Sequence, residues 1–229
     1  MRTLMVSLSL IVLASCQGFP GILPPSPTGI LGDDVLSTVV TGMSPEQINQ
    51  LKQHRLSLQI KKAGGDVNLN MALYPASTIV GVDLHQTQVM DEDLLQLKAF
   101  PNLRTLNLYG THITDAGLEN LVPLRGLQTL RLANTEVTDA GLQSLQKLPD
   151  LRELGLTHTK VTDQGLATLA NMKTLTELTL SGSQITDAGL KQLRSLTHLK
   201  KLVLIKTSAT KAGVQQFQRA VPDAHVYFG

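Results

Sequence analysis

Apolar residues recur along the chain at a fixed interval from residue 79 onward, so that Ile79, Leu103 and Leu127 take equivalent positions. The periods open with an L-x-x-L-x-L pattern, as in "LRTLNL" at 103–108 and "LQTLRL" at 127–132. Alternation of the second and third leucines predicts a short strand that turns both side chains into a core. Leu118, Leu121 and Leu124 then recur at helical spacing, which predicts a short helix packed back onto the strands.

A phrase of the form I/V-T-D-x-G-L separates strand from helix in four of these periods. Its copies begin at Ile113, Val137, Val161 and Ile185. A fixed period of 20–50 residues is typical of stacked-repeat proteins, in which no repeat has a core alone. Six repeats align without a gap over 79–222, starting at Ile79, Leu103, Leu127, Leu151, Leu175 and Leu199.

The aligned columns predict which side chains are buried. In the three central repeats they are Leu106, Leu108, Ile113, Leu118, Leu121 and Leu124, then Val137, Leu142, Leu145 and Leu148, then Val161, Leu166, Leu169 and Met172. Burying one such side chain contributes about 1.5–3 kcal/mol. Because only 3% of residues are aromatic and Trp is absent, we expect an aliphatic core.

The recurring phrase contains the residues that begin a helix. Thr114, Thr138, Thr162 and Thr186 are natural N-caps. Each following Asp would meet the positive end of the helix dipole, and the small Gly would let adjacent turns approach closely. A carboxylate ladder that binds cations is the alternative. One Asp per repeat lacks the several oxygen ligands of a calcium site, so we expect no metal.

Different patterns flank the repeats. We interpret 33–78 as an N-terminal cap, because a first repeat would otherwise expose its apolar side. A capping box at "SPEQ", an apolar stripe of Ile48, Leu51, Leu58 and Ile60, and the pair Gly64–Gly65 predict a helix. "DVNLN" at 66–70 alternates like a strand. At the other end, "SATKAGV" departs from the phrase, and 223–229 is expected to form a capping strand.

These repeats resemble the leucine-rich repeat family, most closely its 24-residue bacterial type with T-D-x-G-L in the returning arm. The resemblance implies an α/β fold: a right-handed, horseshoe-shaped solenoid with a parallel concave sheet and short convex helices. The family usually places Asn or Cys where this chain has Thr or Ser, a column that we interpret as structural. Its members are Thr87, Thr111, Thr135, Thr159, Ser183 and Thr207.

The segment 1–15 has the pattern of a secretion signal. Arg2 precedes an apolar stretch at 4–13, which is too short to span a membrane as a helix. "LASC" resembles a bacterial lipobox, which predicts lipid attachment at Cys16; the alternative is an ordinary signal with a chance cysteine. Residues 16–32 are rich in Pro and Gly and predict a linker. By resemblance to Gram-negative lipoproteins, Gln17 favours the outer membrane.

Outward positions of the predicted strands are the candidate binding face. The first strands carry large polar groups there, and Tyr and Arg are frequent interface anchors. We therefore predict a partner-binding site on the concave face, with Glu153 holding the guanidinium of Arg131. The alternative is an ordinary soluble strand face. The candidate residues are Asp83, His85, Asn107, Tyr109, Arg131 and Glu153.

Composition narrows the function. A net charge of +2 argues against a nucleic-acid binder, and one cysteine allows no internal disulfide. Nucleophile-elbow, zinc and phosphate-loop motifs are absent, so we expect neither an enzyme nor a cofactor. The expected function is a monomeric, lipid-anchored module that binds a protein partner at the cell envelope. A glycan or cell-wall binder is the alternative, and an enzyme that uses 33–78 or His85 is a weaker one.

Charge is unevenly distributed along the repeats. The first repeat has acidic residues at Asp83 and 91–93, whereas Lys and Arg are frequent from residue 200 onward. This asymmetry either orients a charged partner or is a coincidence of a short chain.

The lipobox predicts that a Cys16→Ala variant leaves the membrane fraction of cells and loses acyl label, because Cys16 would carry the lipid. Fractionation and labelling with a radioactive fatty acid measure both. Unchanged membrane retention with unchanged label would contradict the lipoprotein interpretation.

Overall fold

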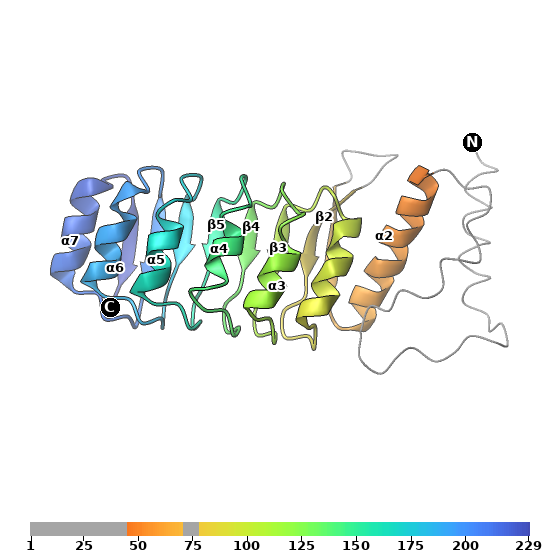
Figure 1. The fold of residues 1–229 in the computed structure, drawn as a ribbon, viewed down its shortest axis with the longest axis horizontal. Helices are drawn as coiled ribbons and strands as arrows, with labels where there is room; N and C mark the ends of the chain where they lie inside the picture. The colour runs from red at the N-terminus through yellow and green to blue at the C-terminus, as the bar shows by residue number, and fades with distance from the viewer. Residues whose placement is uncertain (1–44, 71–77) are drawn as a thin grey trace.

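The computed structural model describes residues 45–70 and 78–229, which form an elongated, two-layered solenoid (Figure 1). One layer is a sheet, and the other is a row of short helices (Figure 1). The sheet contains β1 (Asp66–Asn70), β2 (Thr78–Asp83), β3 (Thr105–Asn107), β4 (Thr129–Arg131), β5 (Glu153–Gly155), β6 (Glu177–Thr179), β7 (Lys201–Leu204) and β8 (His225–Phe228), in this order. The helices are α2 (Pro45–Lys62), η3 (Asp91–Ala99), α3 (Asp115–Asn120), α4 (Leu142–Leu145), α5 (Asp163–Leu169), α6 (Asp187–Gln192), η4 (Leu193–Ser195) and α7 (Lys211–Ala220).

The strands from β2 to β7 pair in parallel, and each residue lies beside its equivalent in the next repeat. Leu106 lies beside Leu130, and Leu130 lies beside Leu154. The period of the sequence is therefore the register of the sheet, and the predicted solenoid fold is confirmed. β8 continues the parallel order beside β7.

β1 differs from the other strands because it pairs with β2 in the antiparallel direction. Only the segment 71–77 connects the two strands. A parallel crossover needs a dozen or more residues, so a connection this short reverses the chain. The sheet is accordingly parallel only from β2 onward.

The core lies between the two layers, and the predicted core residues of the three central repeats are all buried. It is aliphatic except in repeats one and six, where Phe100 and Phe217 are fully buried. The predicted stripe on α2 is wrong at Leu58, which is 42% exposed, and right at Ile60, which is buried together with Leu56. The side chains of Ile48 and Leu51, its other two residues, lie outside the described part of the structure. Residues four apart share one face of a helix, and residues two apart do not.

The column of Thr and Ser residues is buried except at the half-buried Thr207, and it makes mostly local hydrogen bonds. Thr111 donates its hydroxyl hydrogen to the carbonyl of Leu108, and Thr135 donates to Leu132 in the same way. Ser183 instead donates to Leu156, in the preceding repeat. The short hydroxyl thus satisfies the turn within a repeat, consistent with the structural role expected for this column.

The Asp of the recurring phrase reaches the next repeat. Thr138 donates its backbone N–H to Asp115 Oδ1 (2.8 Å) and its hydroxyl hydrogen to Asp115 Oδ2 (2.6 Å). We call this pair of bonds the Asp–Thr link. Four further links join Asp91 with Thr114, Asp139 with Thr162, Asp163 with Thr186 and Asp187 with Thr210.

The same hydroxyls cap the helices, as predicted for three of the four phrases. Thr114, Thr162 and Thr186 each accept a hydrogen bond from a backbone N–H in the first turn of the following helix. Thr138 accepts from Ala140 N, but α4 begins only at Leu142. A hydroxyl has one hydrogen and two lone pairs. It can therefore accept the capping hydrogen bond from a backbone N–H and donate its own hydrogen to the Asp carboxylate at the same time.

The glycine of the phrase leaves room for the link. A Cβ on Gly165 would collide with Asp139 Oδ1 and with Leu142, and Gly117, Gly141, Gly189 and Gly213 are in the same position relative to their own neighbours. The close approach expected at this Gly is therefore confirmed, and the group that approaches is the carboxylate of the preceding repeat.

The last link responds to acid in a defined direction. Hydrogen bonds from the Thr210 backbone N–H and then from its hydroxyl lower the pKa of Asp187 below its ordinary value, although desolvation opposes them. A lowered folded pKa adds stability above the unfolded pKa of about 3.9, and that stability is lost as pH falls through the folded pKa. This link is therefore intact at neutral pH and weakens only in acid.

A Gly165→Ala variant tests the link. Alanine normally favours a helix over glycine, but here its methyl group would push Asp139 away from Thr162. We expect a loss of about 1.5–3 kcal/mol in the free energy of unfolding, measured by urea denaturation, since both bonds involve a charged acceptor.

Gly155→Ala in β5 is the matched control, because a Cβ there makes only ordinary contacts with Thr179 and Arg131. Its free energy of unfolding should be preserved. Equal losses in the two variants would show that the Asp–Thr link has no special role.

The column assignment predicts a second contrast. Leu154 is 2% exposed in the middle of the stack. Its replacement by Ala should lower the free energy of unfolding by about 2–5 kcal/mol. Glu136, whose carboxylate makes only an exposed ion pair with Lys160 at 3.5 Å, should tolerate Ala within about 0.5 kcal/mol. Equal unfolding midpoints would contradict the assignment.

Candidate functional site

Parallel pairing arranges the outward side chains of β2 to β7 in straight rows. We call this surface the sheet face. One row contains Asp83, Asn107, Arg131, Gly155, Thr179 and Val203. Because neighbours in a row come from successive repeats, side chains far apart in the sequence meet on a surface that the core holds in place.

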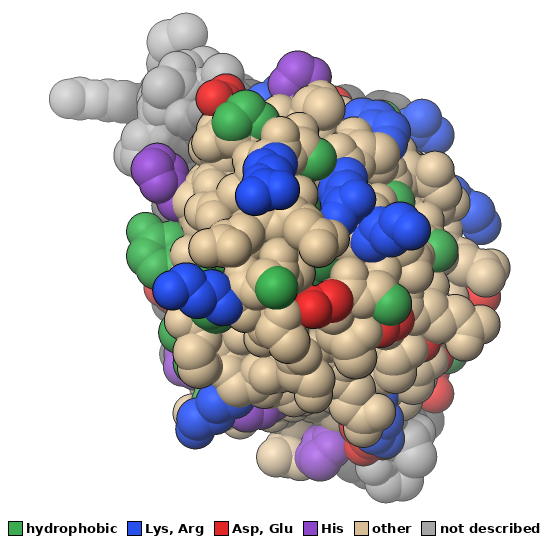
Figure 2. Space-filling model, turned by 90° about the vertical axis from the view of Figure 1, so that its left-hand side faces the viewer, with side chains coloured by type: hydrophobic (Ala, Val, Ile, Leu, Met, Phe, Trp, Pro, Cys, Tyr) green, Lys and Arg blue, Asp and Glu red, His purple; other side chains and the backbone are tan. Residues whose placement is uncertain are grey.

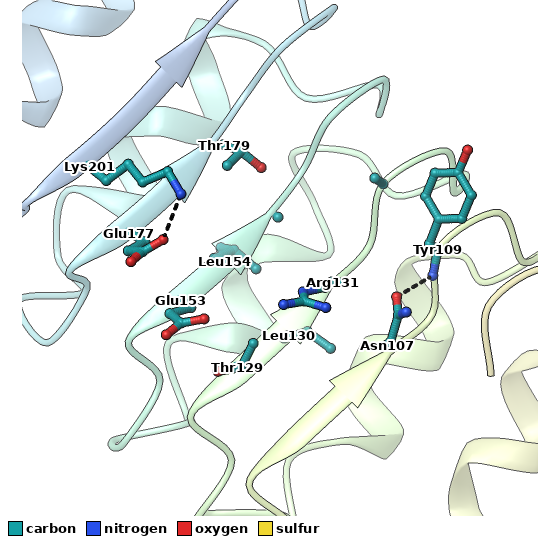
Figure 3. Close-up of a pocket in the computed structure, with 12 residues that line it drawn as sticks. Asn107, Tyr109, Thr129, Leu130, Arg131, Glu153, Leu154, Glu177, Thr179 and Lys201 are labelled. Carbon is teal, nitrogen blue, oxygen red and sulfur yellow. Dashed lines mark hydrogen bonds and ion pairs between the residues drawn. The ribbon is translucent and has the colours of Figure 1, made fainter. Parts of the chain in front are cut away.

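The sheet face is hollowed over β3 to β7. The hollow has a volume of about 330 Å³. Gly155 has no side chain, and Ala133, Thr129 and Thr179 are small. Arg131 lies in the middle of the hollow, between Glu153 on one side and Asn107 on the other (Figure 3). The lining residues are Asn107, Tyr109, Thr129, Leu130, Arg131, Ala133, Glu153, Leu154, Gly155, Glu177, Thr179 and Lys201.

Four of the six candidate residues line this hollow: Asn107, Tyr109, Arg131 and Glu153. The other two lie toward the N-terminal end, where they bind each other. His85 Nδ1 is 2.8 Å from Asp83 Oδ1, and the backbone N–H of His85 donates to the same oxygen. The six residues therefore form two groups on one face.

Hydrogen bonds keep Asp83 ionised. Burial by itself would raise the pKa of this carboxyl group. Bonds from the His85 backbone and ring and from the Asn107 amide outweigh it, so the pKa lies below the ordinary value. Asp83 is consequently a fixed negative charge at neutral pH, with His85 already held beside it.

The expected contact between Glu153 and Arg131 is wrong. The ion pairs of the described residues do not include these two side chains, and Arg131 points into the hollow with no partner drawn (Figure 3). They project from neighbouring strands but from different rows, so their Cα atoms lie about 8 Å apart by ideal strand spacing and rise. The hollow therefore contains one unpaired cation and one unpaired carboxylate.

Two lining residues were missed as candidates. Lys201 Nζ lies 3.2 Å from Glu177 Oε2, across the strands β7 and β6 (Figure 3). Both residues stand in the same row as Glu153, which could have signalled them. Their ion pair forms the far wall of the hollow and leaves its middle to Arg131 and Glu153.

Tyr109 stands at the opposite wall and is 37% exposed. Its backbone N–H donates to Asn107 Oδ1 at 3.2 Å. Gly110 follows with a φ of +66°, a left-handed conformation in the turn after β3. The same position in the other repeats is also left-handed, at Gln86, Asn134, His158, Gly182 and Lys206. This turn directs the Tyr109 ring along the rim of the hollow (Figure 3).

Two other kinds of site are absent from the described part of the chain. Residues 45–70 and 78–229 contain no group of three or more His, Cys, Asp or Glu side chains placed to hold a metal ion. None of the helices in these ranges is both long and apolar enough to cross a membrane.

Comparison with known proteins identifies the repeats. A family model described as "Leucine Rich repeat" matches residues 101–122, 126–145, 147–170 and 171–193. No curated protein sequence matches the chain. Because the family match lies within the stacked repeats and the strands pair in register, the leucine-rich repeat fold expected from the sequence is confirmed.

Solved structures of bacterial proteins match part of the chain. A leucine-rich repeat protein of Leptospira interrogans is 21% identical, with a TM-score of 0.52, over 65% of this chain and 37% of that one. An internalin of Listeria monocytogenes, InlF, is 24% identical, with a TM-score of 0.49, over 65% of this chain and 46% of the internalin. Internalin C2 of the same species is 19% identical, with a TM-score of 0.47, over 66% of this chain and 81% of the internalin. The chain thus spans less than half of the first two proteins.

Proposed function

We propose that this leucine-rich repeat protein is a lipid-anchored module of the bacterial cell envelope that binds a partner protein through its sheet face. The observation that carries the proposal is the hollow over β3 to β7, with its unpaired Arg131 and Glu153 beside the exposed Tyr109. Repeat solenoids commonly use such extended faces for binding.

The chemistry of the hollow suits a protein surface. Arg131 offers a planar guanidinium to a carboxylate, and Glu153 offers a carboxylate to a Lys or Arg. An interface in which each charge meets its opposite gains specificity and correct register. Tyr109 adds a large amphipathic contact that loses little conformational entropy on binding.

A glycan ligand is the second candidate, and the lining disfavours it. Sugars commonly stack on aromatic rings, whereas Tyr109 is the only ring among the residues that line the hollow. Catalysis has less support. Among the described residues, no nucleophile is hydrogen-bonded to His85, and the Nδ1 atom of His85 is bonded to Asp83. The membrane attachment in this proposal rests on Cys16 and the lipobox, which lie outside the described residues.

A double variant tests the binding face. Cross-linking in intact cells, followed by identification of the captured protein, supplies the partner for measurements with purified proteins. Tyr109→Ala combined with Arg131→Ala should then weaken binding by at least about 2 kcal/mol, the usual hot-spot threshold. The unfolding midpoint should hardly change, because both side chains are exposed.

The control pair lies on the helical side, where Gln143 and Lys147 are exposed. Replacing both with Ala should leave the affinity intact. Loss of binding in this pair, with full binding in the Tyr109 and Arg131 pair, would move the site to the helices.

A further inference from the structure

The C-terminal end of the solenoid has a charge that the rest of the chain does not share. Residues 188–229 contain seven Lys and Arg residues and one Asp, a net charge of +6. Residues 1–187 contain thirteen Lys and Arg residues and seventeen Asp and Glu residues, a net charge of −4. The near-neutral total therefore conceals a strongly basic end, and of its seven cations only Lys201 also lines the hollow of the sheet face.

Some of these seven cations remain available to a ligand. Lys200 pairs with Asp223 at 2.8 Å, and Lys201 pairs with Glu177 at 3.2 Å. Lys206, Lys211 and Arg219 are exposed and form no ion pair among the described residues. Lys211 begins α7, and Arg219 lies in its last turn, about 12 Å further along the helix.

Apolar side chains are exposed at the same end. Tyr227 and Phe228 on β8 are 54% and 42% exposed, and Ile205, after β7, is 44% exposed. Figure 2 looks onto this end, where Lys and Arg side chains are spread over the surface among isolated hydrophobic ones. The three unpaired cations Lys206, Lys211 and Arg219 come from α7 and from the turn after β7, and none of them lines the hollow.

We propose that this basic end, formed by Lys206, Lys211, Arg219, Tyr227 and Phe228, binds an anionic lipid surface. The negative potential of such a surface attracts Lys and Arg side chains near it, and exposed Tyr and other apolar side chains enter the interfacial layer. A broad end with dispersed cations and single apolar groups fits a flat, negatively charged bilayer better than a narrow peptide.

The charges also argue against a second copy of the chain as the occupant. Two basic ends would repel each other. The opposite end of the solenoid carries α2, whose exposed residues include Lys52, Lys61 and Lys62, so that helix is a poor complement to a basic surface. This contact is independent of the lipid proposed at Cys16 and of the hollow over β3 to β7, which none of these five residues lines.

Vesicle sedimentation of the full chain tests the proposal. One set of vesicles contains phosphatidylcholine alone, and the other contains equal amounts of phosphatidylcholine and phosphatidylglycerol. The apolar segment at 4–13 would bind both sets, so the ratio of the two partition coefficients isolates the effect of charge. We expect at least about tenfold preference for the anionic vesicles at low salt, which added salt should reduce.

The variant Lys206→Glu, Lys211→Glu, Arg219→Glu should lose this preference. Its matched control is Lys98→Glu, Arg125→Glu, Lys147→Glu, with the same change in net charge on exposed residues of the earlier repeats. The control should keep most of the preference. If the Glu variant at the end does not fold, the corresponding triple Gln variant should show a partial loss.

Other outcomes separate the alternatives. Equal binding to both vesicle sets, or equal losses in the two triple variants, would overturn the proposal. So would binding of soluble polyglutamate without anionic vesicles, which would assign this end to an acidic protein. The Tyr109 and Arg131 double variant should keep its vesicle preference, and the end variant should keep its partner, so failure of either site is distinguishable.

Discussion

The Asp–Thr link sets the spacing of the stack, and much of the remaining structure depends on it. A repeat whose carboxylate holds the backbone and hydroxyl of the next repeat cannot shift along its neighbour without losing two charge-assisted hydrogen bonds. The glycine three residues after each linked Thr is needed because the carboxylate of the preceding repeat occupies the space of a Cβ. Thr, Asp and Gly therefore act as one unit that spans two repeats, which explains why they recur together.

A fixed spacing on the helical side has a consequence on the opposite surface. The strands of the sheet keep the register of the repeat, so the outward side chains stand in rows. Arg131, Gly155 and Thr179 are adjacent although each belongs to a different repeat. The core and the links stabilise these rows without using the outward side chains. Those positions are free to vary in chemistry, as the change from Arg to Gly to Thr along one row illustrates.

Periodicity explains what could be predicted and what could not. It places Leu106, Leu108 and Ile113 in the core, because burial follows the strand and helix periods. Leu58 was misplaced because a single helix outside the repeats offers no second copy to check its phase. The partner of each Asp was missed since helix reasoning is local, whereas the link joins two successive repeats. Arg131 and Glu153 were wrongly paired because the repeat period fixes the position of each Cα atom. It does not determine which way a side chain on the surface points. The left-handed turn was missed because its residues, among them Gln86 and His158, share no side-chain type.

The first and sixth repeats each carry only one half of an Asp–Thr link. In the first repeat, Asp91 is present to hold Thr114, but Met90 and Asp93 stand where Thr and Gly would receive a preceding carboxylate. In the sixth repeat the reverse holds: Thr210 and Gly213 receive Asp187, and Lys211 stands where the next Asp would be. Lys211 cannot form an Asp–Thr link, and it adds to the positive charge of the C-terminal end. The phrase that is acidic in the earlier repeats is therefore basic in the sixth, so the change of charge along the solenoid includes a position of the link itself.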